Sequence, residues 1–73
     1  MNSEQLLQQN LPLARIVMES NGIGIGKYSV SATVKANGDQ ECTVSPTKEN
    51  SSLFTDKVQD DLTAAGFRVQ ITT

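Results

Sequence analysis

The strongest constraint on this chain is a run of strictly alternating residues at positions 28–36, followed by Asn37-Gly38-Asp39 and a second alternating run at positions 40–46. Successive side chains of a β-strand point to opposite faces, so alternation is typical of a strand with one buried face. The first run carries Val30, Ala32, Val34 and Ala36 on one face and Ser29, Ser31, Thr33 and Lys35 on the other. The two runs therefore predict a half-buried β-hairpin.

The register of this hairpin follows from the requirement that apolar residues stay on one face. A two-residue turn would place Val34 opposite Glu41 and mix the faces. A three-residue loop at positions 37–39 avoids this mixing, and we expect that register. It predicts the inner pairs Ala36–Gln40, Val34–Cys42 and Ala32–Val44 and the outer pairs Lys35–Glu41, Thr33–Thr43 and Ser31–Ser45. A five-residue loop keeps the same faces and remains an alternative, because the usual three-residue loop has glycine last and here Gly38 is central.

An amphipathic segment at positions 3–20 precedes the hairpin, and its apolar residues fit one broad face of a helix. These residues are Leu6, Leu7, Leu11, Leu13, Ala14, Val17 and Met18. Ser3 is the expected N-cap, and Asn21-Gly22 the expected end. Pro12 has no amide hydrogen, so it either kinks a continuous helix or lies in the first turn of a second helix that begins at Asn10.

After the hairpin, the polar positions 46–52 predict a loop. Apolar residues then recur at helical spacing from Leu53 to Ala65, with Ser51 or Ser52 as the expected N-cap and Gly66 at the expected C-terminal position. The last alternating run, at positions 67–71, predicts a short third strand beside either edge of the hairpin.

The element order predicts one α+β domain that covers residues 1–73. We expect a two-layer α-β-β-α-β fold, with a three-stranded, mainly antiparallel sheet and two helices on one face. Only 37% of the 73 residues are hydrophobic. Because a core of this size gives about 3–5 kcal/mol of stability, packing against a partner is a plausible supplement.

Few residues can carry catalytic chemistry. The chain has no histidine, which removes the commonest general base near neutral pH. Cys42 falls on the inner face, where a buried structural thiol is expected. The glycine-rich positions 22–26 do not match a phosphate-binding loop, because Lys27 is followed by tyrosine rather than serine or threonine. The sequence predicts a protein that is not an enzyme and has no cofactor or small-molecule ligand.

The charge pattern also selects no particular ligand. Asp56, Asp60 and Asp61 gather on the second helix, but without a ligand loop they predict a solvated face rather than a metal site. The net charge of −2 comes from acidic and basic residues spread along the chain. No basic, apolar leader and no run of about 20 apolar residues is present. We therefore expect a cytoplasmic location and no membrane contact.

The remaining candidate is the polar face of the hairpin, which carries small hydroxyl side chains and few charges. Such faces and sheet edges invite addition of a partner strand. We expect a protein–protein interaction module, such as an accessory, inhibitory or assembly subunit of bacterial or phage origin, whose partner is another protein or a second copy. The residues expected to contact this partner are Ser31, Thr33, Lys35, Glu41 and Thr43.

An alternative function is weak nucleic-acid binding through Lys27, Lys35 and Arg68. Tyr28 is the one aromatic residue that this surface would offer for stacking, and it lies on the same side of the strand as Val30, so it is expected to point inward. Nucleic-acid-binding sheets usually expose several aromatic residues and a clear positive excess. The composition therefore favours the protein-binding alternative.

Overall fold

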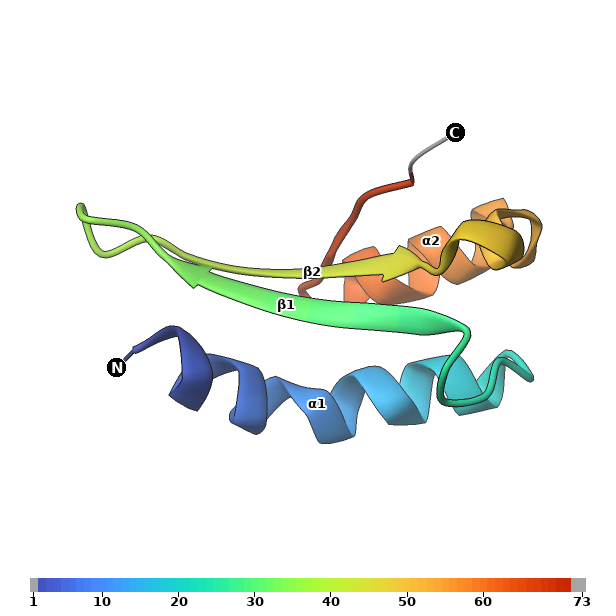
Figure 1. Ribbon diagram of the computed structural model, residues 1–73, viewed down its shortest axis with the longest axis horizontal. Coiled ribbons are helices and arrows are strands. Elements are labelled where there is room, and N and C mark those ends of the chain that lie inside the picture. Colours follow the sequence, from blue (N-terminus) through green and yellow to red (C-terminus); the bar gives the residue numbers. More distant parts are fainter. Residues whose placement is uncertain (1, 72–73) are drawn as a thin grey trace.

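The computed structural model describes residues 2–71 and has the predicted α+β architecture (Figure 1). Helix α1 lies beneath the hairpin, and α2 packs against α1 and the third strand. The elements are α1 (Ser3–Ser20), β1 (Tyr28–Val34), β2 (Gln40–Pro46), the 3-10 helix η1 (Lys48–Leu53), α2 (Asp56–Ala64) and β3 (Arg68–Val69). None of the helices within residues 2–71 combines the length and apolar character needed to cross a membrane.

The hairpin keeps the predicted inner and outer faces, but its expected register is wrong by two residues. Strands β1 and β2 pair antiparallel with Val34 opposite Gln40, Ala32 opposite Cys42 and Val30 opposite Val44. Five residues thus lie between Val34 and Gln40, the last paired residues of the two strands, as in the longer-loop alternative. On the outer face the observed pairs are Thr33–Glu41, Ser31–Thr43 and Ser29–Ser45.

The conformation of Gly38 explains the register. The amide of Gly38 donates to the Lys35 carbonyl at 2.9 Å, and the Lys35 amide donates to the Asp39 carbonyl at 2.8 Å. Gly38 has a φ of 92°, which makes it the left-handed residue that ends a three-residue hairpin loop. Within the five residues that join the strands, Lys35 and Asp39 are thus hydrogen-bonded to each other. The tight loop between them spans positions 36–38, with glycine in its preferred last place.

We expect the substitution Gly38→Ala to destabilise the protein by about 1–2 kcal/mol, because a side chain is strained in the left-handed region. Gly24→Ala is the matched control. Gly24 does not have positive φ, and an added Cβ would meet nothing within 4 Å. This control is expected to stabilise by about 0.4–1 kcal/mol through the unfolded state. Urea unfolding of both variants checks the prediction, and a shift of the same sign in both would contradict it.

Helix α1 is continuous through Pro12, so the alternative of a second helix starting at Asn10 is wrong. Pro12 and Gln8 are both exposed, so water can hydrogen-bond the Gln8 carbonyl that has lost its helical donor.

The N-cap of α1 is Asn2 rather than the expected Ser3. The Asn2 side chain accepts from the Gln5 amide at 2.9 Å, and the Gln5 side chain accepts from the Asn2 amide at 3.0 Å.

Both α-helices end as predicted, at a glycine. After α1, the Gly22 amide donates to the Glu19 carbonyl and the Ile23 amide to the Met18 carbonyl, at 2.9 and 3.0 Å. Gly66 has the same role after α2, and it is followed by the buried Phe67. In both cases positive φ at glycine lets the chain turn back, so that the next apolar residue packs into the core.

The start of the second helix differs from the prediction. The expected loop contains η1, and α2 begins only at Asp56, with Thr55 as its N-cap instead of Ser51 or Ser52. The Thr55 hydroxyl accepts from the Val58 amide at 3.4 Å. Phe54 is nevertheless buried, because the turn between η1 and α2 still directs it inward.

Strand β3 is shorter than expected and pairs in parallel with β2, so β2 is the central strand.

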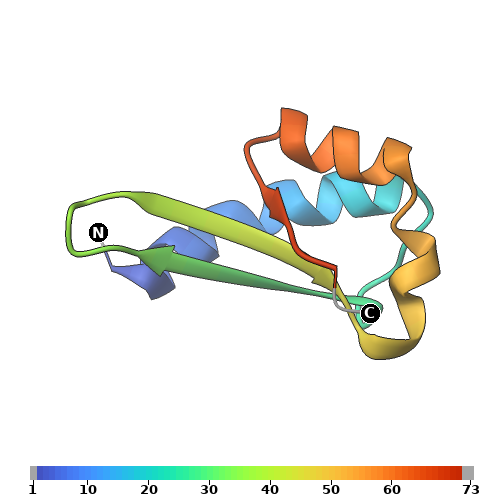
Figure 2. The same cartoon turned by 90° about the horizontal axis from the view of Figure 1, so that it is seen from above.

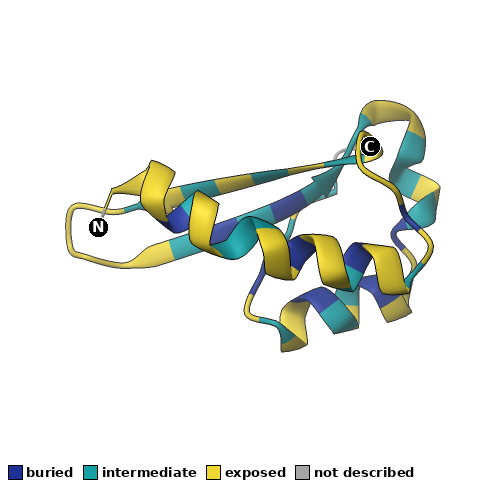
Figure 3. Ribbon diagram, turned by 90° about the horizontal axis from the view of Figure 1, so that it is seen from below, coloured by how far each residue is buried: buried dark blue, intermediate teal, exposed yellow. Residues whose placement is uncertain are grey.

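Figure 3 shows that exposed residues cover the sides of α1 and α2 that face away from the sheet. The buried core joins α1, the Ile23 turn, β2, the Phe54 turn, α2 and the residue that precedes β3. Its members are Leu6, Ala14, Met18, Ile23, Cys42, Val44, Phe54, Val58, Leu62 and Phe67.

Candidate interaction surface

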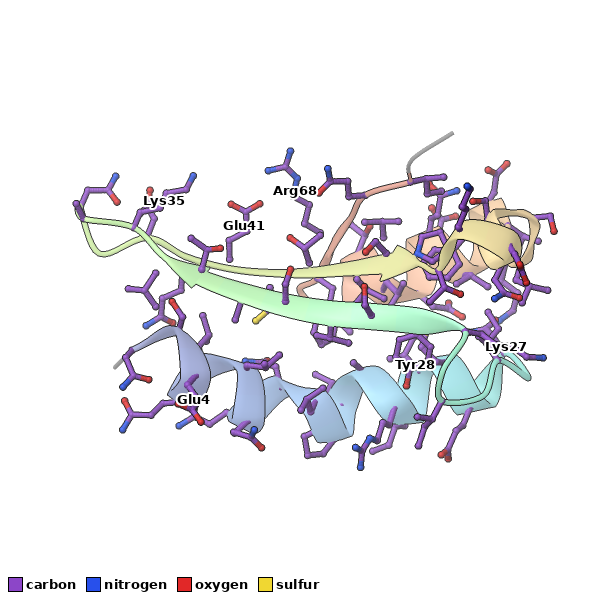
Figure 4. All side chains as sticks on the ribbon, viewed as in Figure 1. Glu4, Lys27, Tyr28, Lys35, Glu41 and Arg68 are labelled. Carbon is purple, nitrogen blue, oxygen red and sulfur yellow. The ribbon has the colours of Figure 1, made fainter. Side chains whose placement is uncertain are left out.

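The sheet has an outer face that neither helix covers. In Figure 4 the side chains of Lys35, Glu41 and Arg68 project from the side of the sheet opposite α1, whereas Tyr28 lies on the α1 side. All five residues predicted as partner contacts lie on this face. We define the outer face as Ser29, Ser31, Thr33, Lys35, Glu41, Thr43, Ser45 and Arg68.

A charged cluster occupies one part of the outer face. Arg68 Nη1 donates to Glu41 Oε1 at 2.6 Å, and Lys35 Nζ lies 3.6 Å from Glu41 Oε2. The side chains of Lys35 and Arg68 are more than half exposed, whereas that of Glu41 is 25% exposed. Glu41 thus shares one negative charge between two cations, and the cluster keeps one net positive charge.

The hydrogen bond from Arg68 is the largest influence on the Glu41 carboxyl, and it lowers the pKa from its ordinary value of 4.5. A carboxyl with a lowered folded-state pKa stabilises the fold above its unfolded pKa, and this contribution is lost as pH falls through the folded value.

We expect Arg68→Gln to raise the pKa of Glu41 toward 4.5, and Lys35→Gln to raise it less, because Lys35 contributes less to the shift. A carbon-13 NMR titration of the Glu41 carboxyl in both variants makes this comparison. Midpoints that stay at the wild-type value in Arg68→Gln would show that the ion pair does not form.

The rest of the outer face is small, polar and uncharged. Ser29 Oγ and Ser45 Oγ lie 3.1 Å apart in a cross-strand hydrogen bond. Ser31 and Thr33 are exposed, whereas Thr43 is half-buried because it lies between Ser31 on β1 and Arg68 on β3. Small side chains of this kind leave the sheet flat, so another surface can approach it closely.

The outer strand β1 has an unpaired edge. Hydrogen bonds at the two ends of the hairpin, from the Lys35 amide to the Asp39 carbonyl and from the Thr47 amide to the Lys27 carbonyl, fix which residues of β1 face β2. Residues Ser29, Ser31 and Thr33 direct their amides and carbonyls toward β2. The intervening residues Tyr28, Val30 and Ala32 direct theirs away from the sheet.

No strand within residues 2–71 lies beside this edge, and Figure 2 shows β1 along the open side of the sheet, opposite β3. The Val34 amide also points away from β2, but it has a partner, because it donates to Ser3 Oγ at 3.3 Å. The side chains of β1 on the inner face are only half-buried, whereas Cys42 and Val44 on β2 are buried. The edge is therefore incompletely covered both along its backbone and on its apolar side.

The three cations of the nucleic-acid alternative do not form one patch. Lys35 and Arg68 meet at Glu41, but Lys27 precedes the opposite end of β1 (Figure 4). Lys27 and Lys35 are eight positions apart, which is roughly 27 Å along a strand. The structure thus separates Lys27 from the pair that it brings together.

Two further titratable side chains, those of Cys42 and Asp61, are held in structural contacts. Burial raises the pKa of the Cys42 thiol, as is usual for an inert core cysteine. Asp61 accepts from Lys57 at 2.8 Å and from Asn21 at 3.1 Å, and these bonds lower its pKa. Within residues 2–71 no group of three or more cysteine or acidic side chains is arranged to hold a metal ion.

Comparisons with protein-family models, with curated proteins and with solved structures found no match for this chain.

Proposed function

We propose that this protein is a non-enzymatic interaction module that binds another protein through the outer face and the open edge of its sheet. A polar face with small hydroxyl side chains beside one charged cluster adjoins an edge strand whose outward backbone groups at Tyr28, Val30 and Ala32 face no other strand, and this combination supports the proposal. Proteins commonly block such edges with charges, proline or a covering element. Here positions 28–34 of β1 carry neither charge nor proline.

The proposal makes the protein an accessory, inhibitory or assembly subunit that acts in the cytoplasm. A single cysteine that is buried and free is compatible with a reducing compartment, where small domains do not depend on disulfides. The helices offer a less suitable surface, because most of their exposed side chains are charged or amides whose ordering on binding costs entropy, although Leu13 and Ile16 of α1 are also exposed.

The test compares charge insertion on the two sides of the molecule. Ser31→Lys combined with Thr33→Lys is expected to weaken capture of the partner from lysate by at least about tenfold, because both side chains are exposed on β1 and would keep a flat surface at a distance. The double variant is preferable to one that includes Thr43, whose half-buried side chain lies beside Arg68.

Gln8→Lys combined with Thr63→Lys adds the same charge at exposed helix positions and is the matched control. Capture is measured by mass spectrometry with and without nuclease treatment, and circular dichroism establishes that each variant is folded. Equal loss of the partner from both double variants would contradict the proposed surface. Enrichment that disappears with nuclease would instead support the nucleic-acid alternative.

A further inference from the structure

We propose that the open edge of β1 binds an extended segment of a partner protein, antiparallel to β1, with carboxylates at both ends of an uncharged stretch. This inference rests on the proposed function and names the chemistry of its partner. Added strands gain affinity from backbone hydrogen bonds and specificity from alternate side chains. The outward amides and carbonyls of Tyr28, Val30 and Ala32 supply the backbone part.

The apolar side of the edge is incompletely covered. The inner side chains of β1 are half-buried, and the first turn of α1 reaches the edge where Ser3 Oγ accepts from the Val34 amide. Leu7 and Leu11 follow Ser3 at intervals of four residues, which places them along one side of α1, and both are half-buried. Alternate apolar side chains of an added strand would cover these residues.

Charge favours a foreign segment over a second copy in the register that pairs two β1 strands along their whole length. Lys27 and Lys35 flank the uncharged strand at both ends. When two β1 strands pair antiparallel about Ser31, Lys27 of each copy stands opposite Lys35 of the other, and like charges in that position are destabilising. A segment with carboxylates eight positions apart places one opposite each lysine. Lys27 is free for such a pair, since it makes no ion pair within residues 2–71.

The probe is a nine-residue peptide of sequence EVTVTVTVE, whose glutamates have the required spacing. In antiparallel alignment its valine amides face β1 and its threonine amides face away. A version N-methylated at the three threonines cannot stack on itself but can still bind the edge. A version N-methylated at three valines has the same composition and lacks the donors that β1 requires. We expect calorimetry to show that the valine-methylated peptide binds at least about tenfold more weakly than the threonine-methylated peptide.

Reversing the charge at Lys27, and then at the peptide glutamate expected opposite it, tests whether the two residues pair. Lys27→Glu should weaken binding of the threonine-methylated peptide, and replacing the last glutamate of that peptide by lysine should restore it. Restoration by replacing the first glutamate instead would overturn the antiparallel orientation. Ala32→Pro removes an outward amide, which an edge strand tolerates, and changes a side chain that packs against the core. We expect this variant to fold, as circular dichroism will show, and to lose binding.

Equal affinity of the two methylated peptides, or no binding of either, would overturn strand addition at β1. Sedimentation of the free protein as a dimer would overturn the choice of a foreign segment over a second copy. If the peptides fail while Ser31→Lys with Thr33→Lys still loses the partner, the proposed function stands and the strand-addition inference alone is wrong.

Discussion

Replacing Leu62 with alanine is expected to remove most of the free energy of unfolding and to leave a substantial fraction of the protein unfolded at 25 °C in water. Leu62 is fully buried and lies where α2 meets the rest of the core. Removing a buried leucine costs about 2–5 kcal/mol through lost burial and the cavity that remains. A domain of this size has a total stability of only about 3–5 kcal/mol, so one such cavity removes most of it.

The matched control is Ile16→Ala on α1. Ile16 is 64% exposed, so its replacement should change stability by less than about 0.5 kcal/mol. Urea unfolding followed by far-ultraviolet circular dichroism gives both values. A Leu62→Ala midpoint equal to that of the control would mean that α2 does not pack on the core as described.

The helices and the faces of the hairpin could be predicted because their signals are local. Alternation at positions 28–36 and 40–46 depends only on which neighbours are apolar, and parity alone placed Thr33 and Glu41 on one face. The register required more, because it depends on which residue of the loop adopts positive φ. Gly38 takes that role at the end of the loop, and this shifted every expected pair by two residues.

The caps were harder to predict for a related reason. Asn2 and Ser3 are both good N-caps, and only the reciprocal bonds with Gln5 decide between them. At the second helix, Leu53 and Phe54 continue the helical spacing of the apolar residues although they precede α2. Periodicity indicates which residues face the core, and here the end of η1 and the turn after it turn Leu53 and Phe54 inward although neither belongs to the α-helix.

The composition of the candidate surface depended on the third strand. Parity placed Ser31, Thr33, Lys35, Glu41 and Thr43 together, but Arg68 joins Glu41 only because β3 pairs with β2. The same pairing decides which hairpin strand remains at the edge. Since the sequence allowed either side, the open edge of β1 could not be predicted from it.

The second large effect is expected in amide hydrogen exchange along β1. The Ser31 and Thr33 amides bond to β2, so they should exchange mainly through unfolding of the hairpin. The Val30 and Ala32 amides point away from the sheet and have no partner within residues 2–71. With a total stability of about 3–5 kcal/mol, the bonded amides should exchange about 10²- to 10³-fold more slowly than the outward ones.

This exchange measurement, made by NMR on the free protein, tests the central claim that β1 presents an unpaired edge. The structure predicts alternating protection, with slow exchange at Ser31 and Thr33 and fast exchange at Val30 and Ala32. Slow exchange at all four amides would show that the edge is already covered, and both the proposed surface and the added strand would then be contradicted.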